Sequence, residues 1–160
     1  MALIVEDGSG LPNAESYVSV SDAAAYLTAM GSPAFGSAQP ADQEAALRRA
    51  TQYLDTRYTF IGEPMTDTQA LQWPRSGAPV WPVRGIVAAC CELAGRALND
   101  ALWSDQDDAQ ITRETVGPIT VEYAHGQNDG QVRFAIVDGL LRGLVSGAGS
   151  RLTLRLERAS

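Results

Sequence analysis

Few of the residue types that perform catalysis occur in this sequence of 160 residues. It has one histidine, His125, and two cysteines, Cys90 and Cys91, which are adjacent. A catalytic histidine needs a partner group that positions it, and a zinc site needs three or four ligands. These three residues supply neither arrangement. A solvated loop histidine and two buried free thiols are the simpler interpretation.

Three aspartates have the spacing that begins a calcium-binding loop: Asp105, Asp107 and Asp108. Such a loop needs glycine at its sixth position and glutamate at its twelfth, where this sequence has Gln110 and Val116. The sequence also contains no lysine, so it has no phosphate-binding Walker motif. We therefore expect a protein that is not an enzyme and that holds no metal and no cofactor.

Aromatic and basic residues alternate in one segment of the chain. Its members are Trp73, Arg75, Trp81 and Arg84. This pattern is typical of proteins that stack the bases of single-stranded DNA on aromatic rings. The alternative is that both tryptophans fill the edge of the hydrophobic core.

The overall charge argues against general binding of nucleic acid. The sequence has 12 basic and 19 acidic residues, which gives a net charge of −7 at pH 7. Phosphate binding depends on cationic contacts, so an acidic chain is a poor candidate for it. Apolar residues make up 45% of the sequence, as in globular domains. No apolar run approaches the roughly 20 residues that span a membrane, and the N-terminus lacks the basic region of a signal peptide.

Hydrophobic periodicity predicts a mainly α-helical fold, a small bundle of about four helices with one β-hairpin and a C-terminal extended strand. The helices are expected at residues 22–30, 40–58, 82–102 and 132–144, and the hairpin at residues 111–123. Ser19 and Asp22 have the spacing of a helix cap. Gly85 and Gly95 fall inside the third helix, where each costs up to ~1 kcal/mol relative to alanine. A close approach of another helix would explain them.

The C-terminal segment is expected to differ from the helical domain, residues 1–146. Residues 147–160 combine a flexible linker with a strand in which leucine and arginine alternate. A lone strand is marginally stable, so we expect it to join a sheet of another chain; the alternative is pairing with the hairpin of its own chain. The candidate docking residues are Arg151, Leu152, Leu154, Arg155, Leu156 and Arg158, and the candidate hairpin contacts are Val116, Ile119, Val121 and Tyr123.

Six short motifs are similar, in the same order, to those of a bacteriophage protein family. They are Gly10–Ser19, Ala45–Asp55, Gln69–Arg75, Glu92–Ala94, Val116–Tyr123 and Val137–Leu141. Members of this family are often described as DnaT-like single-stranded-DNA-binding proteins, and the family also resembles the head–tail connectors. The likeness spans nearly the whole chain.

The resemblance implies a virion structural protein, the head–tail adaptor (connector) subunit of a tailed bacteriophage. Such subunits form a closed ring of about twelve copies. The expected partners are the portal protein, a tail or stopper protein and further copies of the chain, with double-stranded DNA passing through the lumen without specific binding. The expected location is the head–tail interface of the virion, and the host cytoplasm during assembly. The alternatives are a DnaT-like single-stranded-DNA-binding replication protein and another tail-completion or stopper protein.

Overall fold

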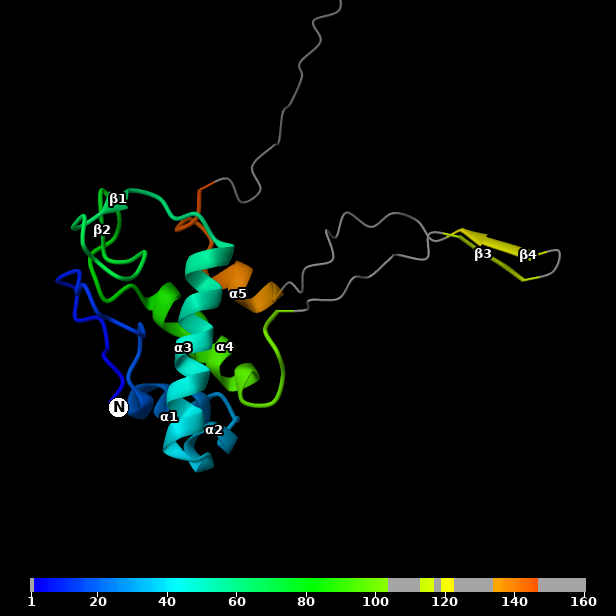
Figure 1. The fold of residues 1–160 in the computed structure, drawn as a ribbon, viewed down its shortest axis with the longest axis horizontal. Helices are drawn as coiled ribbons and strands as arrows, with labels where there is room; N and C mark the ends of the chain where they lie inside the picture. Colours follow the sequence, from blue (N-terminus) through cyan, green and yellow to red (C-terminus); the bar gives the residue numbers. More distant parts are fainter. Residues whose placement is uncertain (1, 104–112, 117–118, 123–133, 147–160) are drawn as a thin grey trace, which may run out of the picture.

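The computed structural model describes residues 2–103, 113–116, 119–122 and 134–146 (Figure 1). These residues form five helices and two short antiparallel strand pairs, which confirms the predicted fold class. The helices are α1 (Val20–Ala29), α2 (Ala34–Ser37), α3 (Pro40–Arg57), α4 (Arg84–Ala97) and α5 (Ala135–Leu140). Strand β1 (Glu63–Pro64) pairs with β2 (Arg75–Ser76), and β3 (Arg113–Val116) pairs with β4 (Ile119–Glu122).

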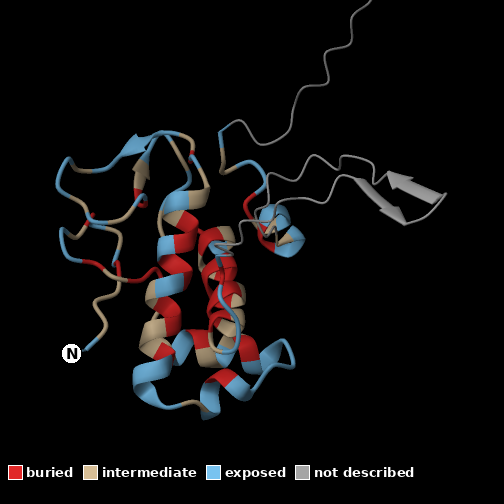
Figure 2. Cartoon of the chain, turned by 45° about the vertical axis from the view of Figure 1, so that its right-hand side comes forward, coloured by how far each residue is buried: buried red, intermediate tan, exposed pale blue. Residues whose placement is uncertain are grey.

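Helices α3 and α4 lie side by side and form the centre of the fold (Figure 1). Their buried residues, red in Figure 2, form stripes along both helices. The fully buried members include Leu47, Ala50 and Leu54 of α3 and Ile86, Cys90 and Leu93 of α4. Each buried leucine or isoleucine contributes about 1.5–3 kcal/mol relative to an exposed one. Packing of α3 on α4 is therefore the main source of stability.

The ends of the helices follow local signals in the sequence. The Oγ atom of Ser19 accepts a hydrogen bond of 3.1 Å from the backbone N–H of Asp22, which confirms the predicted cap of α1. Pro40 opens α3, where its missing N–H has no cost. Helix α4 begins at Arg84 and ends at Ala97, so it is shorter than the predicted range of 82–102.

Two further helices differ from the sequence prediction. Helix α2 lies within residues 32–39, which were expected to form a loop. Its Phe35 is buried, and the backbone oxygen of Phe35 accepts a 2.7 Å hydrogen bond from the side chain of Gln43 in α3. This tertiary contact between α2 and α3, which the sequence of α2 alone does not reveal, stabilises the helix. Helix α5 covers only part of the predicted range of 132–144.

Both glycines within α4 lie where another element approaches closely, as expected. A Cβ atom on Gly85 would lie 2.4 Å from the backbone oxygen of Leu140, at the end of α5. A Cβ atom on Gly95 would lie 3.1 Å from the side chain of Leu27 in α1. The first contact is with backbone and the second with a side chain that has rotatable bonds.

Several predicted contact residues fall outside the described residues. These include all six candidates in the C-terminal segment, and Tyr123. The hairpin is described by its backbone alone, with Val116 opposite Ile119 and Glu114 opposite Val121. The expected docking of the C-terminal strand therefore stays a prediction. Among the described residues there is no helix with the length and apolar character that a membrane crossing requires.

Substitution of Gly85 by alanine is expected to destabilise the fold by about 1–3 kcal/mol, because backbone must move to admit the methyl group. Gly95→Ala is the matched control. There the side chain of Leu27 has only to shift slightly, and alanine gains up to ~1 kcal/mol of helix propensity. Urea unfolding of the two variants and the wild type measures both effects. Equal stabilities for the two variants would contradict this account of α4 packing.

Candidate nucleic-acid interface

The structure divides the four residues of the aromatic–basic segment into two pairs. Trp73 is fully buried and packs edge-on against Phe60, with ring centroids 5.9 Å apart. The guanidinium group of Arg75 donates hydrogen bonds of 2.7 Å and 2.6 Å to the backbone oxygens of Ile61 and Gly62. Trp73 therefore has no exposed ring face for a base, and Arg75 holds the loop that carries β1 and β2.

The other pair lies nearer the surface. Trp81 is half-buried, and its ring centroid lies 5.6 Å from that of Tyr17. Gly8 covers part of the same ring, since a Cβ there would lie 2.8 Å from the Trp81 Cδ1 atom. Arg84 is exposed at the first turn of α4. This surface therefore offers one exposed arginine and part of one indole ring.

A half-buried carboxyl group fixes the loop next to Trp73. The carboxylate of Asp55 accepts hydrogen bonds from the Tyr17 hydroxyl and, at 3.1 Å, from the backbone N–H of Gln72. The Tyr17 oxygen in turn accepts a 3.2 Å hydrogen bond from the backbone N–H of Trp73. Burial raises the pKa of Asp55 to about 6, although both hydrogen bonds and the charge of Arg75 lower it. The Asp55 carboxylate thus connects Tyr17 of the N-terminal segment, α3 and the loop that contains Gln72 and Trp73.

A second set of aromatic side chains meets around the C-terminal half of α3. Tyr53, which is buried, lies at its centre. The centroid of its ring is 4.8 Å from that of Trp103, 5.5 Å from Phe134 and 6.4 Å from Tyr58. These distances are typical of favourable aromatic pairs. Residues 98–103, which follow α4, run towards the start of α5 (Figure 1), so residues far apart in the sequence come together here.

Two arginines lie on these rings. The guanidinium carbon of Arg96 is 5.4 Å from the ring centroid of Phe134, and that of Arg57 is 5.9 Å from the ring centroid of Tyr58. Both distances are within the range of cation–π attraction. We call this surface the aromatic face. It consists of Tyr53, Arg57, Tyr58, Arg96, Trp103 and Phe134.

Exposure differs across the aromatic face. Trp103 is 40% exposed, Tyr58 and Phe134 are half-buried, and Tyr53 supports them from the core. The Tyr58 hydroxyl donates a 2.6 Å hydrogen bond to the Asp138 carboxylate, which ties α5 to the end of α3. Burial and the Asp138 carboxylate raise the pKa of Tyr58 above its ordinary value. The ring of Trp103 rests on Tyr53, which packs in turn on Tyr58 and Phe134.

Sequence reasoning missed the aromatic face. Its members come from α3, from α4 and from the segments that border residues 104–133. No spacing along the chain links Arg57, Arg96 and Phe134. Phe134 packs on the ring of Tyr53, and the two arginines lie over rings that pack on Tyr53. These contacts exist only in the folded chain.

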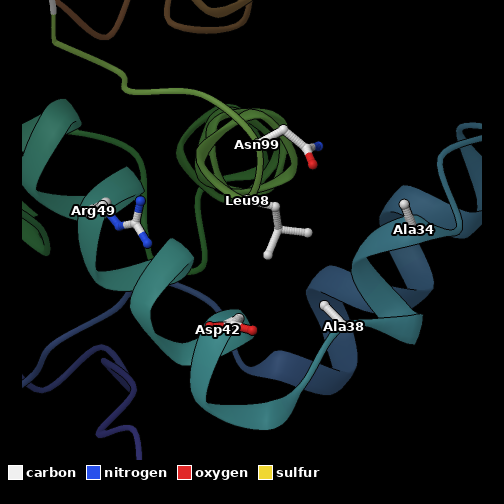
Figure 3. A pocket seen from close by; sticks show the side chains of 6 residues that line it. All are labelled: Ala34, Ala38, Asp42, Arg49, Leu98 and Asn99. Carbon is white, nitrogen blue, oxygen red and sulfur yellow. The ribbon is translucent and has the colours of Figure 1, made fainter.

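A hollow of about 200 Å³ lies between α2, α3 and the end of α4 (Figure 3). It is lined by Ala34, Ala38, Asp42, Arg49, Leu98 and Asn99. Arg49 donates a 3.0 Å hydrogen bond to the backbone oxygen of Ala97 and so caps α4. Because Asp42 and Arg49 carry opposite charges, the hollow favours neither phosphate nor a cation. The described residues contain no cluster of three side chains suited to a metal ion.

The fold and surface define a small helical domain with a partly exposed set of aromatic and arginine side chains. Comparison with protein families matches residues 1–159 to the family described as "Putative DnaT-like ssDNA binding protein". The match covers almost the entire sequence, and the chain belongs to this family. Comparisons with curated proteins and with solved structures give no match.

The predicted identity as a phage head–tail adaptor is wrong, because the family match is to DnaT-like single-stranded-DNA-binding proteins. The predictions that depended on it are also wrong: a virion structural role, portal, tail and stopper partners, a ring of about twelve copies and duplex DNA in its lumen. The net charge of −7 favoured the adaptor over the alternative of DNA binding. The net charge does not describe where the charged residues lie. Arg57 and Arg96 each lie over an aromatic ring of the aromatic face.

Asp55→Asn is expected to remove a pH dependence of stability between about pH 4 and pH 6. The pKa of Asp55 is 3.8 ordinarily and about 6 in the folded protein. In this range the folded chain keeps a proton that the unfolded chain has released, so this group lowers stability as pH rises. The total loss is at most roughly 3 kcal/mol.

Urea unfolding at several pH values measures this effect. The wild type should lose stability relative to Asp55→Asn as pH rises through the range. Asp42→Asn, at an exposed position, is the control and should track the wild type. A difference between wild type and Asp55→Asn that stays constant with pH would show that the carboxyl group titrates normally.

Proposed function

We propose that this protein binds single-stranded DNA, and that the aromatic face is the binding surface. The observation that carries the proposal is the ring of Trp103, which is 40% exposed and rests on Tyr53 at 4.8 Å. Two arginines lie on neighbouring rings of the same face. The family description supports the same class of ligand.

Unpaired bases suit this surface for a physical reason. Every base has an aromatic face that stacks on an exposed ring, and each such contact contributes about 1–3 kcal/mol. Trp103 is held from beneath by Tyr53, so little side-chain entropy is lost when a base stacks on it. Bases within a duplex are already stacked on one another, and their faces do not reach a surface ring. The aromatic face therefore favours single strands.

The acidic composition limits the electrostatic part of binding. Arg57 and Arg96 are the cations of the aromatic face, against the carboxylates of Glu92 and Asp138 beside them. Each phosphate contact with a single strand adds about −0.7 to the slope of log K against log salt. With one or two such contacts, we expect a shallow slope of roughly −0.7 to −1.4. Stacking supplies most of the remaining affinity.

We also infer that the protein acts by binding and not as an enzyme. The sparse supply of histidine and cysteine, with both thiols buried, supports this inference. Burial raises the pKa of Cys90 to about 11 and that of Cys91 to about 12, so both are poor nucleophiles at neutral pH. The location of the protein stays a prediction.

Trp103→Ala is expected to weaken binding of an oligothymidine strand by about fivefold to a hundredfold, the loss of one stacked base. Fluorescence anisotropy of a labelled strand measures the affinity. In the wild type, the strand should also quench tryptophan emission, because Trp103 is the tryptophan with the largest exposed area. Trp103→Ala should lose most of this quenching.

Trp81→Phe distinguishes the aromatic face from the surface that contains Trp81 and Arg84. It should keep both the affinity and the quenching. If Trp103→Ala binds as the wild type does and Trp81→Phe does not, the binding surface lies near the start of α4. If the folded wild type binds no single strand at low salt, the proposed function is wrong.

A further inference from the structure

An ion pair holds the arginine that lies on Phe134. The Nη1 atom of Arg96 donates a 2.9 Å hydrogen bond to the carboxylate of Glu92, one helical turn earlier in α4, and a 2.8 Å bond to the backbone oxygen of Glu92. The same guanidinium group lies over the Phe134 ring at 5.4 Å. Arg96 thus keeps one orientation while its side chain remains 37% exposed.

Glu92 is less accessible than its partner. Its side chain is 14% exposed, and the other partner that the structure gives its carboxylate is the Tyr26 hydroxyl, at 3.4 Å. If Arg96 turned to a DNA phosphate, the Glu92 carboxylate would keep only this long hydrogen bond. A partly buried carboxylate that loses its cation is strongly disfavoured. The phosphate would also approach a negative charge.

We propose that Glu92 is an internal competitor for Arg96, which keeps this arginine from phosphate and makes the aromatic face depend on unpaired bases instead of backbone charge. The proposal rests on the proposed function. It explains how an acidic domain with exposed arginine discriminates between strands. Duplex DNA offers phosphates but no free base faces, so it gains little from a surface on which Arg96 is already paired.

The variant Glu92→Gln tests this role. It removes the competing charge while keeping a side chain of nearly the same size, so Arg96 becomes available to phosphate. Binding of an oligothymidine strand at low salt should become several-fold tighter. The slope of log K against log salt should become steeper by about 0.7, the contribution of one phosphate contact. A duplex of the same length should also bind more tightly than it binds the wild type.

Glu44→Gln is the matched control. Glu44 forms the same type of ion pair, with Arg48 at 3.2 Å and four residues later in α3, and its side chain is 25% exposed. Arg48 also pairs with Glu15 at 3.1 Å, away from the aromatic face. This variant changes the net charge equally, and it should leave the salt slope and the duplex affinity near those of the wild type. Thermal unfolding is the measurement that checks whether both variants are folded.

The outcomes separate this proposal from the proposed function. Equal changes in Glu92→Gln and Glu44→Gln would mean a general effect of net charge, and weaker binding by Glu92→Gln would mean that the ion pair positions Arg96 for DNA. Either result overturns the role of Glu92 while single-strand binding stands. If neither the wild type nor Glu92→Gln binds any strand, the competitor role and the proposed function are both wrong.

Discussion

The ring of Tyr53 packs at once against side chains from three parts of the chain, and the arrangement of the aromatic face depends on this contact. Tyr53 projects from α3, its neighbour Trp103 follows α4, and Phe134 precedes α5. One buried ring therefore fixes where the chain leaves α4 and where it returns to α5. The same ring supports Trp103 from the side of the core, so core packing and the proposed stacking surface share a residue.

This sharing reconciles an acidic composition with the proposed binding of single-stranded DNA. Net charge governs long-range attraction to phosphate, and by that measure a chain with a net charge of −7 is unfavourable. Stacking acts at van der Waals distance and depends on exposed ring area, which net charge does not describe. In the proposed function, a supported indole ring with a nearby arginine is the source of local affinity within an acidic protein. The adaptor interpretation came from the resemblance of six motifs, and the net charge was then wrongly used as a property of every surface to set aside the DNA-binding alternative.

The parts of the fold that the sequence predicted are those set by local patterns. Helix α3 ends within one residue of its predicted boundary, because its apolar stripe and Pro40 are both local signals. Helix α2 was missed because its stability comes from burial of Phe35 and the hydrogen bond from Gln43. The aromatic face was missed for the same reason: its residues meet only through tertiary packing. The segment from Trp73 to Arg84 was a candidate binding site because its aromatic and basic residues are close in sequence, yet folding places Trp73 in the core.

Substitutions in the aromatic face differ in how strongly they would affect the stability of the fold as well as the binding of DNA. Tyr53 is buried among several rings, so its loss would disturb the core and reveal little about DNA. Trp103 is the outermost ring, and much of its area is already in solvent. The pair of Glu92 and Arg96 spans one turn of α4, with the Arg96 side chain 37% exposed and the Glu92 side chain 14% exposed. Glutamine at this position keeps an oxygen that can accept a hydrogen bond from Arg96, so Glu92→Gln removes the charge that phosphate meets while it keeps the shape of the side chain. This position is where the electrostatics of the surface can be changed while the core that supports it stays intact.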